Sequence, residues 1–143
     1  MLFRNCAGGV VFKGEQVFLL CNDKGEWVLP KGVIRDGDHS RDVALRRVKE
    51  EAGIDAEIIS TAGETSYEFF SMSRKRPVCN EITWYLMEAR NNDFKVNEKD
   101  GFKDGGYFPV EEAIERITYS QDKALLNLAF KRYREIMLNA VNE

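Results

Sequence analysis

One helix-forming segment separates two groups of strand-forming sequence, and this order limits the folds open to the chain. AGGVVF (7–12), EQVFLLCN (15–22) and WVLP (27–30) precede it and are rich in β-branched and aromatic residues. AEIISTAGETSYEFF (56–70) and NEITWYLMEAR (80–90) follow it and have the same character. The first two thirds of the chain therefore predict strands, one helix and then strands again.

The last third predicts two helices. YFPVEEAIERI (107–117) reads as a short strand that enters a helix, and 120–140 is a longer amphipathic segment with Ser120 as a cap. The segments 71–79 and 91–106 are polar or basic and are predicted to be loops. The complete order predicts an α/β fold, in which a mixed sheet carries helices on both faces.

The central helix has recognisable ends. Asp38 or Ser40 can cap its N-terminus, and Gly53 can end it. At 100° per residue, Arg47, Glu50 and Glu51 share a polar side. The side expected to face the core consists of Ala44, Leu45, Val48 and Ala52.

Length and composition indicate one domain, residues 1–143. A chain of 143 residues of which 43% are hydrophobic can build one core, and a second domain is not expected. No apolar run reaches the roughly 20 residues of a membrane-spanning helix. The opening MLFRNCAGG turns polar too quickly for a secretory signal, so a cytoplasmic protein is expected.

The cysteines and the net charge argue against two further classes of protein. Cys6, Cys21 and Cys79 are odd in number and widely spaced, which fits buried thiols better than disulfides or a zinc site. A formal charge of −3 gives no overall basic field for nucleic acid, although a local basic patch stays open.

The end of the central helix carries the residues best suited to a metal ion. Mg²⁺ takes oxygen ligands and commonly combines one or two carboxylates with substrate phosphates. Glu50 and Glu51 stand at such a helix end, beside a loop rich in Gly and Asp. Charged pairs on helices are mostly solvated, so the spacing of the residues before this pair must decide between a metal site and an ordinary solvated surface.

From Gly32 to Ile54 the chain resembles the Nudix box, G-x5-E-x7-R-E-U-x-E-E-x-G-U, where U is a bulky aliphatic residue. The matching positions are Gly32, Arg46, Val48, Glu50, Glu51, Gly53 and Ile54. GEWVLPKG (25–32) is similar to the approach to the box in the subgroup that cleaves dinucleoside polyphosphates. The resemblance implies the Nudix α/β/α sandwich and a pyrophosphohydrolase that uses Mg²⁺, with Mn²⁺ as an alternative.

Two positions of the box differ from the pattern. Asp38 stands in place of a glutamate, which keeps the charge. Arg47 stands in place of a glutamate that the family uses at the metals, so the charge is reversed. A guanidinium about 5 Å from a divalent ion would repel it by roughly 7 kcal/mol at an effective dielectric near ~20. Arg47 can instead pair with Glu50 or Glu51, three and four residues later.

The resemblance also suggests the roles of the site residues. Glu50 and Glu51, with the backbone of Gly32, are the expected metal ligands, and Arg46 is expected to orient a neighbouring carboxylate. The family often adds an acid from the loop before the late helix, where Glu98, Asp100 and Asp104 are available. Glu98 is the predicted acid.

Substrate phosphates need cations and a base needs a flat apolar surface. Lys31, Lys75 and Arg76 are the predicted phosphate ligands. Tyr67 and Tyr85 are the predicted base contacts, with Phe69 and Trp84 as further candidates, and alternation along strands implies that about half of these rings face the core. His39 is expected to be an exposed loop residue.

Two functions follow. The first is a metal-dependent Nudix hydrolase that cleaves nucleoside or dinucleoside polyphosphates, weakened by Arg47. The second is a Nudix fold without hydrolysis that binds a nucleotide or RNA through its cleft and the RKR turn (74–76). Oligomeric state stays open.

Overall fold

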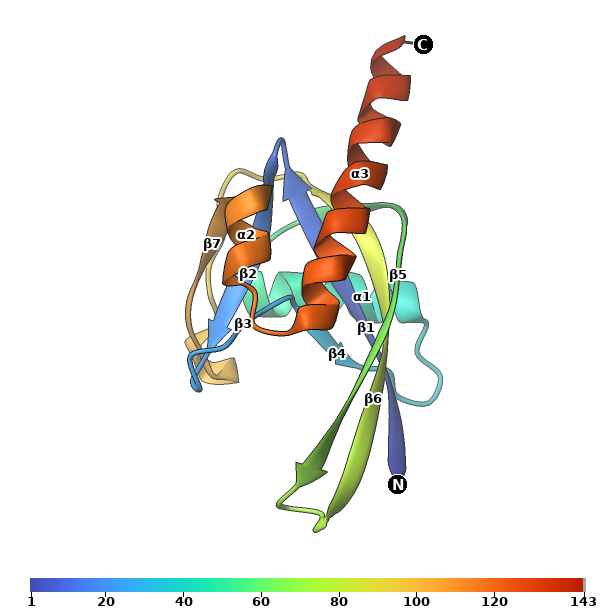
Figure 1. Ribbon diagram of the computed structural model, residues 1–143, viewed down its shortest axis with the longest axis vertical. Helices are drawn as coiled ribbons and strands as arrows, with labels where there is room; N and C mark the ends of the chain where they lie inside the picture. The colour runs from blue at the N-terminus through green and yellow to red at the C-terminus, as the bar shows by residue number, and fades with distance from the viewer. Residues whose placement is uncertain (143) are drawn as a thin grey trace.

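A mixed, curled sheet forms the centre of this computed structural model, which describes residues 1–142 (Figure 1). The strands are β1 (Leu2–Lys13), β2 (Gln16–Asn22), β3 (Trp27–Val28), β4 (Lys31–Val33), β5 (Ala56–Ser71), β6 (Arg76–Ala89) and β7 (Phe102–Pro109). The order β3-β2-β1-β6-β5 forms the main path, while β4 pairs with β1 and β7 pairs with β2. Only the β1–β6 pair is parallel among the pairs of the described residues.

Helices cover both faces of the sheet. The helix α1 (Ser40–Ala52) lies behind the sheet in Figure 1, and α2 (Val110–Arg116) and α3 (Ser120–Asn142) lie in front of it. One apolar core lies under α2 and α3 and contains Phe12, Trp84 and Leu126, whereas the second lies under α1 and contains Val11 and Met87. The predicted α/β sandwich is therefore confirmed. None of the helices within residues 1–142 is long and apolar enough to span a membrane.

The ends of α1 differ in part from the prediction. His39 is the N-cap residue and makes no side-chain cap hydrogen bond, so the expected capping by Asp38 or Ser40 is wrong. The Ser40 hydroxyl is instead 2.5 Å from the Tyr85 hydroxyl. Gly53 ends the helix as predicted, in the left-handed conformation at φ 66°.

Both predicted loops are shorter than expected. The strand β6 begins at Arg76 and pairs Arg76 with Ser71, which leaves residues 72–75 as the turn. The strand β7 begins at Phe102 because the segment 102–109 finds backbone partners along β2. A short 3-10 helix, Glu98–Asp100, precedes β7. Polar composition predicted the loops, but strand pairing decided where they end.

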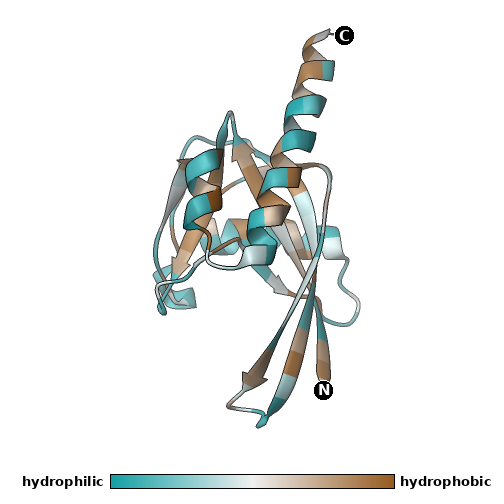
Figure 2. Cartoon of the chain, viewed as in Figure 1, coloured by the Kyte–Doolittle hydropathy of each residue, from teal (hydrophilic) through white to brown (hydrophobic). Residues whose placement is uncertain are grey.

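The β5–β6 hairpin extends well beyond the helices, with the N-terminal end of β1 beside it (Figure 1). Hydrophobic and hydrophilic residues alternate along this projecting part (Figure 2). The three cysteines are free and buried, as the sequence indicated.

Candidate functional site in the cleft beside the central helix

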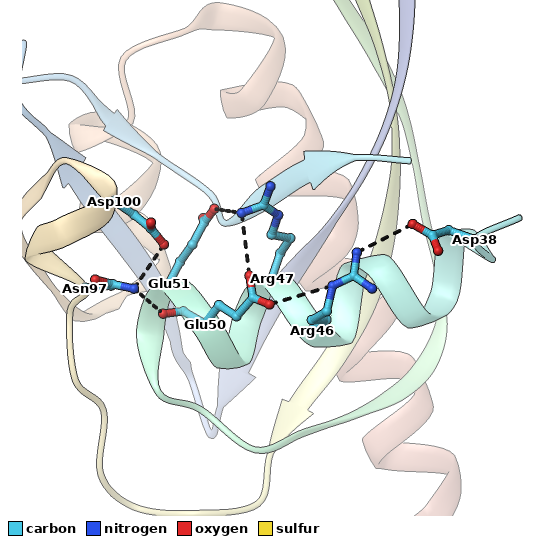
Figure 3. Close-up of polar contacts among 7 residues, drawn as sticks. All are labelled: Asp38, Arg46, Arg47, Glu50, Glu51, Asn97 and Asp100. Atoms are coloured by element: carbon cyan, nitrogen blue, oxygen red, sulfur yellow. Dashed lines mark hydrogen bonds and ion pairs between the residues drawn. The ribbon is translucent and has the colours of Figure 1, made fainter. Parts of the chain in front are cut away.

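Glu50 and Glu51 converge on one cationic atom at the C-terminal end of α1. Nη1 of Arg47 lies 3.6 Å from Oε2 of Glu50 and 3.9 Å from Oε2 of Glu51 (Figure 3). The spacing of three and four residues brings these side chains to one side of the helix. The guanidinium therefore lies between the two carboxylates.

Glu51 is buried although the sequence placed it on the polar side of the helix. Its residue exposure is 5%, whereas Glu50 remains exposed. Burial raises the pKa of Glu51 to about 7, while Arg47, Lys31 and a backbone hydrogen bond from Lys31 act in the opposite direction. A nearby positive charge therefore favours the ionised form of this carboxylate.

Arg46 bridges the start and the end of the same helix. Its guanidinium lies 3.6 Å from Oδ2 of Asp38 and 3.7 Å from Oε1 of Glu50. Because Glu50 forms ion pairs with both Arg46 and Arg47, its carboxylate lies between two cations (Figure 3). Asp38, Arg46 and Glu50 are all exposed, so these ion pairs orient the side chains and contribute little to stability.

Arg47 also packs closely against the backbone at Gly32 in β4. A Cβ added at Gly32 would lie 2.0 Å from Nε of Arg47 and 2.6 Å from its Cγ. Only glycine gives the arginine side chain this path. The glycine of the box therefore does more than shape a loop in this chain, because it makes room for Arg47.

A cleft of about 380 Å³ opens beside Glu51. Lys31, Tyr67, Phe69, Asp100 and Tyr119 are among its lining residues. Acidic, basic and aromatic groups from the strands, from α1 and from the loop before α3 thus face one space. This composition suits a ligand that combines phosphates with a flat ring system.

Two tyrosines form a stacked pair in the cleft. The rings of Tyr67 and Tyr119 are 5.9 Å apart and inclined by 14°, and Nζ of Lys31 lies 5.7 Å from the centre of the Tyr67 ring. The Tyr119 hydroxyl donates to Glu26 over 2.5 Å, which lowers the pKa of Glu26 and raises that of Tyr119 to about 12. Asn80 donates to the Tyr67 hydroxyl over 2.8 Å.

Asp122 is a buried acid near this aromatic pair. It is 7% exposed, and it lines a small cavity together with Lys31, Tyr67 and Tyr119. Burial raises the pKa of Asp122 to about 6, with the Lys31 charge acting in the opposite direction. The Lys31 charge thus lowers the pKa of two buried carboxyl groups, Glu51 and Asp122, against the effect of burial.

The loop after β6 is held against the end of α1 by Asn97. The Asn97 side chain donates to the carbonyl of Glu50 over 3.1 Å and to Oδ2 of Asp100 over 3.0 Å (Figure 3). The Asn97 backbone N–H donates to the carbonyl of Glu51 over 3.0 Å. These bonds place Asp100 in the cleft beside Glu51.

Comparison with known proteins identifies the family of the chain. The family model of the NUDIX domain matches residues 2–128. The chain belongs to the Nudix family. Members of this family act on phosphoanhydride bonds.

Several Nudix proteins are similar to the chain over most of its length. An RNA pyrophosphohydrolase of Roseobacter denitrificans is 26% identical over 80% of this chain and 82% of its own length. The asymmetrical bis(5'-nucleosyl)-tetraphosphatase of Rattus norvegicus is 25% identical over 70% of this chain and 67% of its own. Nudix hydrolase 5 of Arabidopsis thaliana is 27% identical over 79% of this chain, which spans only 38% of that protein.

A solved structure shares the Nudix fold. The Ap4A hydrolase of C. elegans, in a binary complex, superposes with a TM-score of 0.72 and 21% identity over 92% of this chain and 98% of its own. At this identity the likeness concerns the fold alone.

Some predicted Nudix site residues lie at the cleft. Lys31, Glu51 and Tyr67 line it, and Gly32 lies next to Lys31 in β4. Glu98 lies in the 3-10 helix and lines a neighbouring pocket with Glu50, whereas Asp100 lines the cleft. Asp100 is therefore better placed than Glu98 to supply a further acid. Loop positions cannot be aligned from one sequence, so the choice among Glu98, Asp100 and Asp104 stays a prediction.

The prediction for Tyr85 is corrected. Tyr85 is 6% exposed in the core under α1, and its hydroxyl contacts Ser40. Trp84, on the opposite face, is 1% exposed and donates its indole N–H to Thr65. Because side chains alternate along β6, the two rings lie in different cores, one on each face of the sheet. Neither ring can therefore stack on a substrate in the cleft.

Lys75 and Arg76 lie at the end of the projecting hairpin, and neither is among the residues that line the cleft. They are therefore not placed to contact a phosphate beside Glu51. His39 is exposed at the N-terminus of α1, as expected.

Tyr119, Glu26 and Asp122 were missed by sequence reasoning. Tyr119 follows the segment predicted as a helix and precedes the next, and nothing in its neighbourhood marks it as a ligand contact. A tyrosine between two helices and near a Nudix cleft is the only signal that could have pointed to it.

Glu50 and Glu51 form a pair of carboxylates that can bind one divalent ion. Glu50 and Glu51 already hold one cationic atom between them, so the pair suits a cation, and hard divalent ions prefer carboxylate oxygens. In residues 1–142, no three Asp, Glu, His or Cys side chains are grouped to hold a metal. The carboxylate pair therefore fits one ion, provided that Arg47 moves out of its present position.

Proposed function

We propose that this chain hydrolyses a phosphoanhydride bond in nucleoside polyphosphates or dinucleoside polyphosphates. The observation that carries the proposal is the convergence of Glu50 and Glu51 on one cationic atom, next to a cleft that also contains Lys31 and two stacked tyrosines. The relatives named as hydrolases of nucleotides and RNA support the same class of substrate.

Mg²⁺, with Mn²⁺ as an alternative, is the proposed cofactor. Glu50, Glu51 and the backbone carbonyl of Gly32 would hold it once Arg47 has turned away. A bound divalent ion supplies charge neutralisation at the phosphates and activation of water. The raised pKa of Glu51, about 7, means that a nearby cation is needed to keep this carboxylate ionised near neutral pH.

The other side chains bind and orient the substrate. Lys31 offers its ammonium group to the phosphates from a position beside Glu51. Tyr67 and Tyr119 offer ring faces, and each base stacked on an aromatic ring is worth roughly 1–3 kcal/mol. Arg46 holds Glu50 in place through its contact with Asp38, which makes it a positioning residue rather than a catalytic one.

A second function is favoured by one specific observation, the pairing of Arg47 with both carboxylates. If the guanidinium stays there, it occupies the place of the metal, and the cleft binds a nucleotide or RNA without cleaving it. Arg47 would then act as a permanent cation for phosphate oxygens. The location proposed for either function is the cytoplasm, which rests on the sequence alone.

Binding and turnover measured together separate the two functions. The wild-type protein is incubated with ATP and diadenosine tetraphosphate, with Mg²⁺, with Mn²⁺ or with EDTA, and affinity and released products are measured. The hydrolase predicts products that disappear with EDTA. Binding that is equal with and without EDTA, with no product, would instead support the binding protein.

A further inference from the structure

The β5–β6 hairpin sorts charged side chains between its two faces. Residues opposite each other in neighbouring strands point to the same face, and successive residues alternate. Arg76 pairs with Ser71, and Val78 pairs with Phe69, so Arg76 lies on the face of Tyr67 and Phe69. This face is the one that lines the cleft.

Arg4 joins this face from β1. It is opposite Asn80, and its Nε donates to Oδ1 of Asn80 over 2.9 Å. Its guanidinium lies 5.5 Å from the centre of the Phe69 ring. The guanidinium and the ring together offer a flat surface on which a base can stack.

Acidic residues of the hairpin lie on the other face. Glu68 pairs with Cys79 and Glu81 pairs with Ser66, which puts both out of phase with Tyr67 and Phe69. Burial raises the pKa of the Cys79 thiol on that face, and the charges of Glu68 and Glu81 raise it further. Within residues 1–142, neither Arg4 nor Arg76 forms an ion pair with a carboxylate.

These residues continue the cleft in one direction. Glu51 and Lys31 lie at the phosphate end, Tyr67 and Tyr119 form the stacked pair, and Phe69 with Arg4 comes next. Arg76 pairs with Ser71, which is four residues beyond Tyr67, so at about 3.3 Å per residue it lies roughly 13 Å farther along the strand. The surface beyond the first base is thus positive, aromatic and long enough for another nucleotide unit.

The direction of this surface distinguishes two ligands. In a dinucleoside polyphosphate the second nucleoside lies across the polyphosphate, on the far side of Glu51. In an oligonucleotide with a 5′-polyphosphate, the second nucleotide follows the first base and its ribose, which is where Phe69, Arg4 and Arg76 lie. Positive charge without carboxylate partners also suits a phosphodiester.

We propose that Arg4, Phe69 and Arg76 form a subsite for the second nucleotide of a single-stranded, 5′-polyphosphorylated oligonucleotide. This rests on the proposed function for the placement of the polyphosphate beside Glu51. The Phe69 ring and the Arg4 guanidinium take the second base, and Arg76 takes the phosphodiester that follows it.

The test compares the affinity of ATP with that of single-stranded tetranucleotides that begin with a 5′-triphosphorylated adenosine. Calorimetry with Ca²⁺ in place of Mg²⁺ measures binding while limiting turnover. We expect the tetranucleotide to bind about tenfold more tightly, in line with one stacked base and one phosphate contact. The affinity of the tetranucleotide should also fall more steeply with salt, by about 0.7 in log–log slope for each added phosphate contact.

Two variants and one control locate the effect. Arg76→Glu and Phe69→Ala should each remove most of the advantage of the tetranucleotide over ATP. Lys131→Glu makes the same charge change as Arg76→Glu at an exposed position on α3 and should preserve the advantage. Thermal melting of each variant checks that the fold is intact.

Three results would overturn the proposal. Equal affinity of wild type for ATP and the tetranucleotides is the first, and an equal effect of Arg76→Glu and Lys131→Glu is the second. The third is a loss of diadenosine tetraphosphate affinity in Arg76→Glu that equals the loss of tetranucleotide affinity. That result would assign the surface to a second nucleoside. Tighter binding of either an RNA or a DNA tetranucleotide than of ATP supports the subsite. A tenfold higher affinity for the RNA tetranucleotide than for the DNA one would identify RNA as the ligand.

The two proposals fail in different ways. If the tetranucleotide binds more tightly but no nucleotide is hydrolysed with Mg²⁺ or Mn²⁺, the hydrolase is rejected and the subsite stands. If ATP is hydrolysed but the tetranucleotide has no advantage, the subsite is rejected and the hydrolase stands.

Discussion

The side chain of Arg47 runs across the backbone of Gly32, so closely that an added Cβ at Gly32 would lie 2.0 Å from Nε of Arg47. This contact couples the glycine at the start of the box to the arginine that lies between Glu50 and Glu51. A change at one residue must therefore alter the other.

Gly32→Ala tests this coupling. We expect it to lower the free energy of unfolding by about 1–3 kcal/mol, because the methyl group forces Arg47 out of its path. In an Arg47→Ala background the same change should cost much less, since the clash is gone. Urea unfolding of the four proteins in this double-mutant cycle measures the coupling. Equal costs in both backgrounds would show that the side chain does not lie where described.

Arg47→Glu should increase the affinity for Mn²⁺ and Mg²⁺. The change removes the cation between Glu50 and Glu51 and adds a third carboxylate nearby. We expect at least a tenfold gain in Mn²⁺ affinity by titration calorimetry. Lys49→Glu is the matched control, because Lys49 is on the same helix and pairs with Asp55 rather than with the box carboxylates. A similar gain in both variants would mean that only net charge matters.

The stacked tyrosines predict a difference between two substitutions of Tyr119. Tyr119→Phe keeps the ring and loses the hydroxyl that donates to Glu26, whereas Tyr119→Ala loses the ring as well. Tyr119→Ala should weaken ATP binding by about tenfold, in keeping with about 1–3 kcal/mol for one stacked base. Tyr119→Phe should weaken it much less. If the two variants bind ATP equally, stacking on this ring is not part of recognition.

Asp122 makes stability depend on pH. Its folded pKa of about 6 is above the ordinary 3.8, so folding favours the protonated form. The associated stability is fully present below about pH 4 and is lost as pH rises through 6. Asp122→Asn should therefore raise the free energy of unfolding at pH 8 by up to about 3 kcal/mol and change it little at pH 4. Urea unfolding at both pH values checks this, and a gain confined to pH 4 would contradict the buried carboxyl.

Much of the fold was readable because local patterns and tertiary structure agree. Alternating strands and the helix that ends at Gly53 were predicted, and the position of the box on this helix followed from spacing. Glu51 shows where this reasoning stops. Its helical position looks polar, yet the neighbouring strand and loop bury it, which no pattern within the helix can report.

Other site residues depend on contacts between distant segments. Asp100 lies in the cleft because Asn97 hydrogen-bonds both to it and to the end of α1. Tyr85 cannot contact a ligand in the cleft because its position in β6 directs its ring toward Ser40. The opposite parity of Tyr67 and Glu68 on β5 became informative only once the register with β6 was known. Sequence thus predicted the residue types, and strand register decided which of them face the cleft.

The central claim is that Glu51, together with Glu50, holds a divalent ion for hydrolysis despite Arg47. The most direct test measures product release from ATP and diadenosine tetraphosphate with Mn²⁺ in wild type, Glu51→Gln and Arg47→Glu. The account predicts slow turnover in wild type, a loss of at least about 100-fold in Glu51→Gln and faster turnover in Arg47→Glu. Equal turnover in wild type and Glu51→Gln, or no turnover in wild type with a gain in Arg47→Glu, would contradict it.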